Sequence, residues 1–203
     1  SNLKNITADE NFDTFSLSWY NNTDVDPATG LTPYINMQKV LKVCHDFVDN
    51  FDNTFSNLLF IGQTGVGKTF LSNCIARALM DSCHSIIYLT AGEFFDSFKS
   101  DDFKEFGSSK FDTSFFVECD LLIIDDLGTE KASDYNFSNL FNTINERLLR
   151  RKSIIISSNL EMPDIETRYS QRIFSRLVSA YSILRLFGDD IRCMKKLSPT
   201  KRS

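Results

Sequence analysis

The chain has 203 residues, a formal net charge of −5 and a hydrophobic fraction of 42%. This length allows one domain with a complete apolar core, or one domain with a short additional segment. No apolar run approaches the roughly 20 residues that a membrane-spanning helix needs, so we expect neither a membrane protein nor a membrane partner. The five cysteines are scattered, which argues against a disulfide framework or structural zinc site and favours a cytoplasmic protein.

The charges are unevenly distributed along the chain. Residues 1–130 contain 8 Lys and Arg against 20 Asp and Glu, whereas residues 131–203 contain 14 against 7. Two interpretations stay open: chance clustering on a solvated surface, or acidic and basic faces that attract head to tail or touch nucleic acid. The chain begins with Ser-Asn rather than Met, which indicates that the natural protein extends further at its N-terminus.

The N-terminal residues lack a sustained period, but their apolar side chains are too many for a disordered tail: Phe12, Phe15, Leu17, Trp19 and Tyr20. We therefore expect residues 1–35 to form an arm that packs on a core domain of residues 36–203. From Asn36 to Phe51 the apolar residues recur at helical spacing, which predicts a helix with Asn36 as its N-cap.

Short apolar runs alternate with helical periodicity along the rest of the chain. Strands are predicted at 58–61, 85–89, 120–127, 153–157 and 181–187, and helices at 68–80, 91–99, 134–152 and 170–180, with short helices within 100–116. The third of these helices is expected to face inward through Phe137, Leu140, Phe141, Ile144, Leu148 and Leu149. Strands that alternate with helices favour a parallel, doubly wound α/β sheet with right-handed crossovers.

The segment after the first predicted strand fits the pattern G-x-x-x-x-G-K-[ST]. Its glycines let successive backbone N–H groups converge on a phosphate, and the following helix adds the N–H groups of its first turn. Lys68 is expected to reach the β- and γ-phosphates, and Thr69 to bind Mg²⁺. The chain is therefore predicted to bind ATP or ADP through Gly62, Gln63, Thr64, Gly65, Val66, Gly67, Lys68, Thr69 and Phe70.

Polar side chains follow the third and fourth predicted strands. Leu-Leu-Ile-Ile ends in Asp125 and Asp126, and the next strand ends near Asn159. Because parallel strands bring their carboxyl ends to one edge, Asp125 is expected to hold Mg²⁺ and Asp126 to orient or deprotonate the attacking water. Asn159 either positions water against the γ-phosphate or caps the following turn.

Three arginines extend the predicted site. Arg172 and Arg176 lie four residues apart and share one face of a predicted helix, while Arg192 follows the last strand. The helical pair is either a solvated face or a set of arginine fingers that reach a neighbouring subunit's γ-phosphate. Arg192 is expected to contact the nucleotide of its own subunit.

The order of these parts resembles the AAA+ domain of the DnaC/DnaI bacterial replicative-helicase loaders. The resemblance runs from about Phe12 to Lys196 and rests on the P-loop, LLIIDDLGTE, SSNL, QRIFSRL and GDDIR. It implies an α/β AAA+ P-loop NTPase with a five-stranded parallel sheet flanked by helices. It also implies these roles: Walker A for Lys68 and Thr69, Walker B for Asp125 and Asp126, sensor 1 for Asn159, arginine finger for Arg176 with Arg172 beside it, and sensor 2 for Arg192.

Two departures from other AAA+ proteins accompany the resemblance. Asp126 stands where many have Glu, and the chain ends soon after Arg192, before a full C-terminal helical lid. The resemblance implies slow, assembly-dependent ATP hydrolysis and head-to-tail self-association. Its implied partners are single-stranded DNA and a hexameric replicative helicase, the latter bound through an N-terminal domain that this chain is expected to lack.

The DNA-contacting residues stay open. Phe94, Phe95 and Phe98 with Lys99 and Lys104 could stack on bases, but their helical spacing favours core packing. Arg147, Arg150, Arg151 and Lys152 form either a basic patch or a helix end favoured by the dipole. Three other functions stay open as well: a transposition-helper ATPase of the IstB type, a P-loop nucleotide or metabolite kinase, and a nucleotide-gated switch without turnover.

Overall fold

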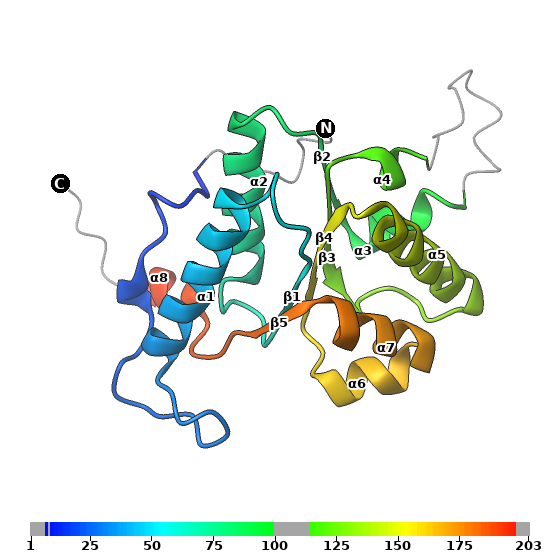
Figure 1. Ribbon diagram of the computed structural model, residues 1–203. Coiled ribbons are helices and arrows are strands. Elements are labelled where there is room, and N and C mark those ends of the chain that lie inside the picture. Colours follow the sequence, from blue (N-terminus) through cyan, green and yellow to red (C-terminus); the bar gives the residue numbers. More distant parts are fainter. Residues whose placement is uncertain (1–6, 8, 100–113, 198–203) are drawn as a thin grey trace.

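A central parallel sheet separates two layers of helices (Figure 1). The computed structural model describes residues 7, 9–99 and 114–197. Its five strands are β1 (Leu58–Ile61), β2 (Ile86–Thr90), β3 (Leu121–Leu127), β4 (Ser153–Ser158) and β5 (Ser182–Arg185). They lie in the order β2-β3-β4-β1-β5, and all four pairings are parallel. The predicted five-stranded parallel α/β sheet is confirmed.

The helices divide between the two faces of the sheet (Figure 1). On one face lie α1 (Pro33–Asp49) and α2 (Lys68–Asp81), with the 3-10 helix η2 (Leu17–Trp19) and α8 (Ile191–Leu197) beside them. On the other lie α3 (Ala91–Asp96), α4 (Phe115–Glu118), α5 (Asp134–Arg150), α6 (Met162–Arg168) and α7 (Gln171–Ala180). No helix within the residues described is long and apolar enough to cross a membrane.

Two apolar cores hold these layers together, because successive strand side chains point to opposite faces. Leu59 and Ile124 belong to the core under α3, α5 and α7, whereas Phe60 and Ile123 belong to the core under α1 and α2. All four side chains are at most 1% exposed. Burial of each contributes about 1.5–3 kcal/mol, so the uninterrupted apolar strands favour a sheet covered on both faces.

The prediction that Asn36 caps the first long helix is wrong. Helix α1 begins at Pro33, and the Thr32 hydroxyl accepts a hydrogen bond from the Ile35 N–H at 3.2 Å. Proline suits the first helical position because it has no N–H to satisfy there. The side chain of Asn36 instead donates to the Arg185 carbonyl at 2.8 Å, which ties α1 to β5.

The inward face predicted for α5 contains one error. Leu149 is 72% exposed, whereas Leu140 and Ile144 are fully buried. Leu149 lies five residues after Ile144 and therefore about 140° around the helix. Helix α6 and helix α8 were not predicted, because each is too short for apolar periodicity to be visible. Most of segment 100–116, including Lys104, lies outside the described residues.

Candidate nucleotide-binding site

The P-loop joins β1 to α2 through a backbone that only glycine accommodates. A Cβ atom at Gly62 would lie 2.0 Å from the Leu186 carbonyl oxygen. Gly67, which precedes the first residue of α2, has φ of 104° and faces the Tyr20 hydroxyl. Residues with a Cβ rarely adopt this conformation, so the spacing of glycines in the motif follows from the turn.

Lys68 is the buried cation of the site and is only 4% exposed. Its Nζ donates to the carbonyls of Gly62 at 2.6 Å and Gln63 at 2.8 Å, and to Asn159 Oδ1 at 2.6 Å. Burial lowers the pKa of Lys68, and the neighbouring carboxylates of Asp126 and Asp125 oppose that effect. The ammonium group is thus held at the start of the loop, where a phosphate group would exchange for these acceptors.

Asp125 accepts hydrogen bonds from three hydroxyl groups. Thr69 Oγ1 and the Tyr88 hydroxyl donate to Oδ2, each at 3.0 Å, and Ser157 donates to Oδ1. The carboxylate is 4% exposed, and these bonds offset the cost of burying its charge. Tyr88 and Ser157 were missed in the sequence because no motif includes them, although both lie on strands next to Asp125.

Asp126 points differently because the strand is irregular at this position. The pairing of β3 with β4 shifts register between Ile124 and Leu127, and Asp126 has φ of 57°. Such a bulge redirects side chains that would otherwise alternate between faces. Burial raises the pKa of Asp126, the charge of Asp125 raises it further, and Lys68 partly opposes both.

Asn159 joins Lys68 to Asp126. Its Oδ1 accepts from the Lys68 ammonium group, and its Nδ2 donates to Asp126 Oδ1 at 3.3 Å. The amide therefore lies between the cation expected to bind phosphate and the carboxylate expected to activate water. An amide can serve both neighbours because it offers an acceptor and two donors.

These groups meet at a cavity of about 460 Å³ between the P-loop, α8 and the N-terminal arm. Of the predicted site residues, the cavity is lined by Thr64, Gly65, Gly67, Lys68, Thr69, Phe70, Asp126, Asn159 and Arg192. Gly62 and Gln63 contribute carbonyls to Lys68, the Val66 carbonyl accepts from Tyr20, and Asp125 lies behind Thr69.

Aromatic side chains also line the cavity: Phe15, Trp19, Tyr20 and Phe70. Phe15 packs edge-on against Phe70 with ring centroids 5.6 Å apart. The Lys195 ammonium group lies 5.7 Å from the centre of the Trp19 ring and 5.9 Å from that of Phe70. Phe15, Trp19 and Lys195 were not predicted as site residues, since they come from the arm and from α8. The rings of Phe15, Trp19 and Phe70 offer flat apolar faces of the kind on which a base stacks.

Oxygen groups around Thr69 suit a magnesium ion. The Thr69 hydroxyl and Asp125 carboxylate are hard ligands of the kind that Mg²⁺ prefers. Asn73 lies one turn further along α2, lines the cavity, and has a buried Oδ1 without a hydrogen-bond donor. Among the described residues no group of three or more His, Cys, Asp and Glu could hold a metal, so phosphate oxygens and water would complete the coordination.

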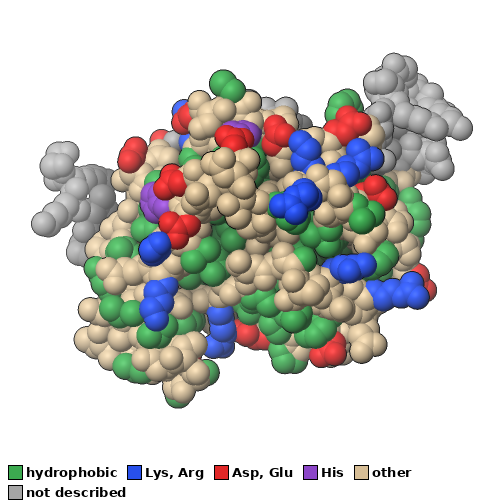
Figure 2. Space-filling model, in the orientation of Figure 1, with side chains coloured by type: hydrophobic (Ala, Val, Ile, Leu, Met, Phe, Trp, Pro, Cys, Tyr) green, Lys and Arg blue, Asp and Glu red, His purple; other side chains and the backbone are tan. Residues whose placement is uncertain are grey.

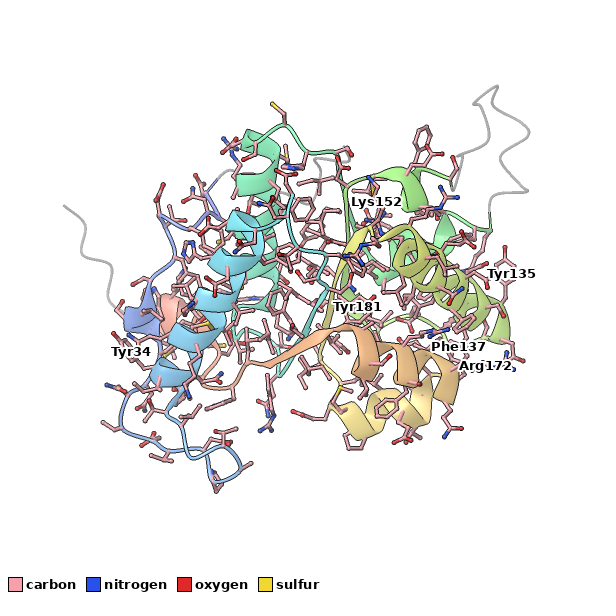
Figure 3. All side chains as sticks on the ribbon, viewed as in Figure 1. Tyr34, Tyr135, Phe137, Lys152, Arg172 and Tyr181 are labelled. Carbon is pink, nitrogen blue, oxygen red and sulfur yellow. The ribbon has the colours of Figure 1, made fainter. Side chains whose placement is uncertain are left out.

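The two arginines of α7 lie away from this cavity. Arg172 and Arg176 are exposed and neither lines it. Figure 3 shows Arg172 on the side of the sheet covered by α5 and α7, whereas α2 and the arm lie on the other side. Arg192 behaves differently: it lines the cavity, and its backbone N–H donates to Asp190 Oδ1 at 2.8 Å.

The basic cluster at the end of α5 is smaller than its sequence suggests. Figure 2 shows Lys and Arg side chains gathered on the half of this face that α5 and α7 occupy. Arg147 is fully buried and does not belong to that surface. Arg150 lies 3.7 Å from Glu146, Lys152 lies 2.7 Å from Asp120, and Arg151 lies over the Phe55 ring. Phe94 and Phe95 are core residues, at most 1% exposed.

Comparison with known proteins shows the family to which the chain belongs. The family model described as IstB-like ATP binding protein matches residues 35–198. The chain belongs to this family. The replicative helicase loader DnaC of Escherichia coli (strain K12) is 23% identical over 151 residues, which cover 74% of the chain and 61% of that protein. The phage-like element PBSX protein XkdC of Bacillus subtilis (strain 168) is 32% identical over 111 residues, covering 52% and 40%.

Solved structures show the same fold as this IstB-like chain. The crystal structure of the DnaC helicase loader matches with a TM-score of 0.71 and 21% identity, over 89% of the chain and 98% of that structure. AMPPCP-bound DnaA from Aquifex aeolicus matches with a TM-score of 0.71 and 17% identity, over 98% and 58%. The chain thus has the AAA+ P-loop fold of these structures. It spans about three fifths of the length of the DnaC relatives that it matches, 61% in the Escherichia coli protein.

Proposed function

We propose that this domain is the ATP-hydrolysing module of a replicative helicase loader in bacterial DNA replication. The observation that supports the proposal is the meeting of Lys68, Thr69, Asp126, Asn159 and Arg192 at one cavity. The similarity to DnaC, together with the IstB-like family model, favours this role among the many functions that P-loop domains perform.

The chemistry proposed for the cavity divides among its residues. Lys68 binds the β- and γ-phosphates, while Thr69 and Asp125 hold Mg²⁺, which supplies charge neutralisation for phosphoryl transfer. Asp126 accepts the proton of the attacking water, and its raised pKa suits it to that task. Asn159 orients Asp126 and Lys68 relative to one another, and Arg192 binds the phosphates from α8.

Self-association completes the site in this proposal. Arg176, with Arg172 beside it, is exposed on α7 and distant from its own cavity, which suits an arginine finger offered to a neighbouring subunit. Single-stranded DNA and a hexameric replicative helicase are the proposed partners. The helicase would be bound through sequence outside this chain.

A transposition-helper ATPase of the IstB type is the second candidate. The family model that matches the chain is named for IstB-like proteins, which favours this alternative over a metabolite kinase. The two candidates share the nucleotide site and differ in their partner. Pull-down of a replicative helicase by the natural, longer protein would favour the loader, and pull-down of a transposase the helper.

The deciding experiment measures the ATPase rate per subunit against protein concentration, with and without single-stranded DNA. We expect the rate to rise with both. We also expect Arg176→Ala to lower the turnover by about 10³-fold or more, while the affinity for ATP stays nearly unchanged. Arg150→Ala, which removes another exposed arginine, is the control for the rate without DNA and should behave like the wild type.

The opposite result is equally informative. A rate per subunit that stays flat with concentration, together with normal turnover by Arg176→Ala, would contradict a site shared between subunits. Absence of turnover under all conditions, with ATP still bound, would favour a nucleotide-gated switch.

A further inference from the structure

Glu10 brings an additional carboxylate into the nucleotide cavity from the N-terminal arm. It lines the cavity together with Lys68, Thr69 and Asp126. Its Oε2 accepts a hydrogen bond from Asn73 Nδ2 on α2. Nothing in the P-loop or the strand motifs points to this residue, since it precedes β1 by almost 50 positions.

The arm that contains Glu10 is docked at several points. The Tyr20 hydroxyl donates to the Val66 carbonyl of the P-loop at 3.1 Å. Phe15 packs on Phe70, and Phe12 stacks on His45 of α1 with ring centroids 4.2 Å apart. All three contacts follow Glu10 along the arm, and they hold the segment next to the carboxylate against the P-loop, α1 and α2.

Glu10 lies beside the face of α2 that includes Thr69, one of the residues expected to bind magnesium. Asn73, its partner, is four residues after Thr69 and therefore on the same face of α2. The charge of Glu10 adds to burial in raising the pKa of Tyr88, whose hydroxyl donates to Asp125. The Oδ1 of Asn73 is buried beside Glu10 without a donor, and a metal-bound water could supply one.

A carboxylate in this position affects two forms of the nucleotide in opposite ways. A metal-free triphosphate is an anion, so Glu10 repels it in a cavity that also contains Asp126. A cation held by Thr69 and Asp125 is attracted by the same charge. Glu10 therefore lowers the affinity for the metal-free nucleotide and raises the affinity for the metal-bound nucleotide.

We propose that Glu10 is a positioning residue that makes nucleotide binding by this domain depend on Mg²⁺. The inference rests on the proposed function, because it requires the cavity to bind a nucleotide with Mg²⁺. It goes beyond that function by assigning the arm a direct part in metal selection.

The test compares dissociation constants for the non-hydrolysable nucleotide AMPPCP with excess Mg²⁺ and with EDTA, by isothermal titration calorimetry. In the wild type we expect the dissociation constant for AMPPCP to be larger with EDTA than with Mg²⁺. In Glu10→Gln, which can still accept from Asn73, the ratio of the two constants should fall about tenfold. Asp13→Asn removes a charge from an exposed residue of the same arm that does not line the cavity, and it should leave the ratio unchanged.

Two further measurements distinguish loss of the Glu10 charge from loss of arm docking. Trp19 is the single tryptophan and lies on the arm beside the cavity, so unchanged emission of nucleotide-free Glu10→Gln verifies that the arm is still docked. Glu10→Asp keeps the charge and should restore most of the ratio. If the Trp19 emission of Glu10→Gln shifts, the arm has moved, and Glu10→Asp with a docked arm is compared with the wild type instead. A lower ratio of the two dissociation constants in Glu10→Asp, despite its retained charge, would contradict the proposal.

The outcomes separate this inference from the proposed function. An unchanged ratio in Glu10→Gln, or an equal fall in Asp13→Asn, overturns the role of Glu10 while nucleotide binding stands. Failure of the wild type to bind AMPPCP under either condition overturns the nucleotide site itself.

Discussion

Asp125 and Asp126 are neighbours in the chain but have different surroundings. Asp125 is buried and accepts hydrogen bonds from Thr69, Tyr88 and Ser157, so its charge is held in one place. Asp126 is more exposed and lines the cavity, with its backbone in the left-handed region. Aspartate tolerates that region better than bulky residues do. One carboxylate is thus suited to metal binding and the other to proton transfer.

This difference predicts distinct effects of two matched substitutions. Asp126→Asn should lower ATP turnover by about 10²–10⁴-fold, because an amide cannot accept the proton of the attacking water. Its dissociation constant for Mg²⁺-nucleotide should change little. Asp125→Asn should instead weaken Mg²⁺-nucleotide binding. Steady-state kinetics and calorimetry measure both, and wild-type turnover by Asp126→Asn would contradict the assignment.

The same assignment predicts the pH dependence of Asp126. Burial and Asp125 raise its pKa, so turnover should fall on the acidic side with a midpoint above the ordinary value of about 3.8.

At the scale of elements, one buried arginine joins four segments of the structure. Arg147 of α5 donates to the carbonyls of Phe116 at 2.7 Å and Asp120 at 3.1 Å, in α4 and before β3. It also donates to the Cys119 carbonyl at 3.0 Å and to that of Ser153 in β4 at 2.6 Å. Burial lowers its pKa, and the carbonyls replace the water that the guanidinium has lost. Arg147 therefore aligns α5 with the start of β3 and β4.

Replacement of Arg147 should be strongly destabilising. Arg147→Ala leaves several buried carbonyls without a donor, and we expect the free energy of unfolding to fall by about 3 kcal/mol or more. Arg150→Ala, one turn away on the solvent side, should change it by less than about 0.5 kcal/mol. Urea unfolding followed by circular dichroism measures both variants. Equal small effects would show that Arg147 is not needed to align these elements.

At the scale of the whole molecule, α7 lies on the opposite face of the sheet from α1, α2 and α8 (Figure 1), and neither of its arginines lines the cavity. The cavity of a subunit is therefore formed without its own Arg176. Contact between α7 of one subunit and the cavity of the next is heterologous, and such contacts build rings or spirals. Head-to-tail assembly is therefore the arrangement that we propose for the active form.

Mixing two inactive variants tests that arrangement. Asp126→Asn retains Arg176, and Arg176→Ala retains an intact cavity, so a mixed assembly contains some complete sites. Equal mixing should restore about a quarter of the wild-type turnover, since random head-to-tail pairing brings the two intact parts together at that frequency. Mixing either variant with buffer is the control. No recovery, despite association measured by sedimentation, would contradict a shared site.

The sequence by itself determined the P-loop, the order of the strands and longer helices along the chain, and the carboxylates at the end of β3. These features depend on local sequence. Glycine is needed where the backbone turns sharply, and a short, continuous apolar run is most easily buried as a strand in the middle of a covered sheet. For the same reason Lys68, Thr69 and Asp126 were assigned to the candidate site before the fold was known.

Tertiary structure alone decided which distant residues meet there. The approach of Glu10 to Asn73, the hydroxyls of Tyr88 and Ser157 on Asp125, and the burial of Arg147 depend on contacts between segments far apart in the chain. Helical spacing predicts which residues share a face but not what covers it. A surface arginine and a buried one are therefore indistinguishable until the packing is known.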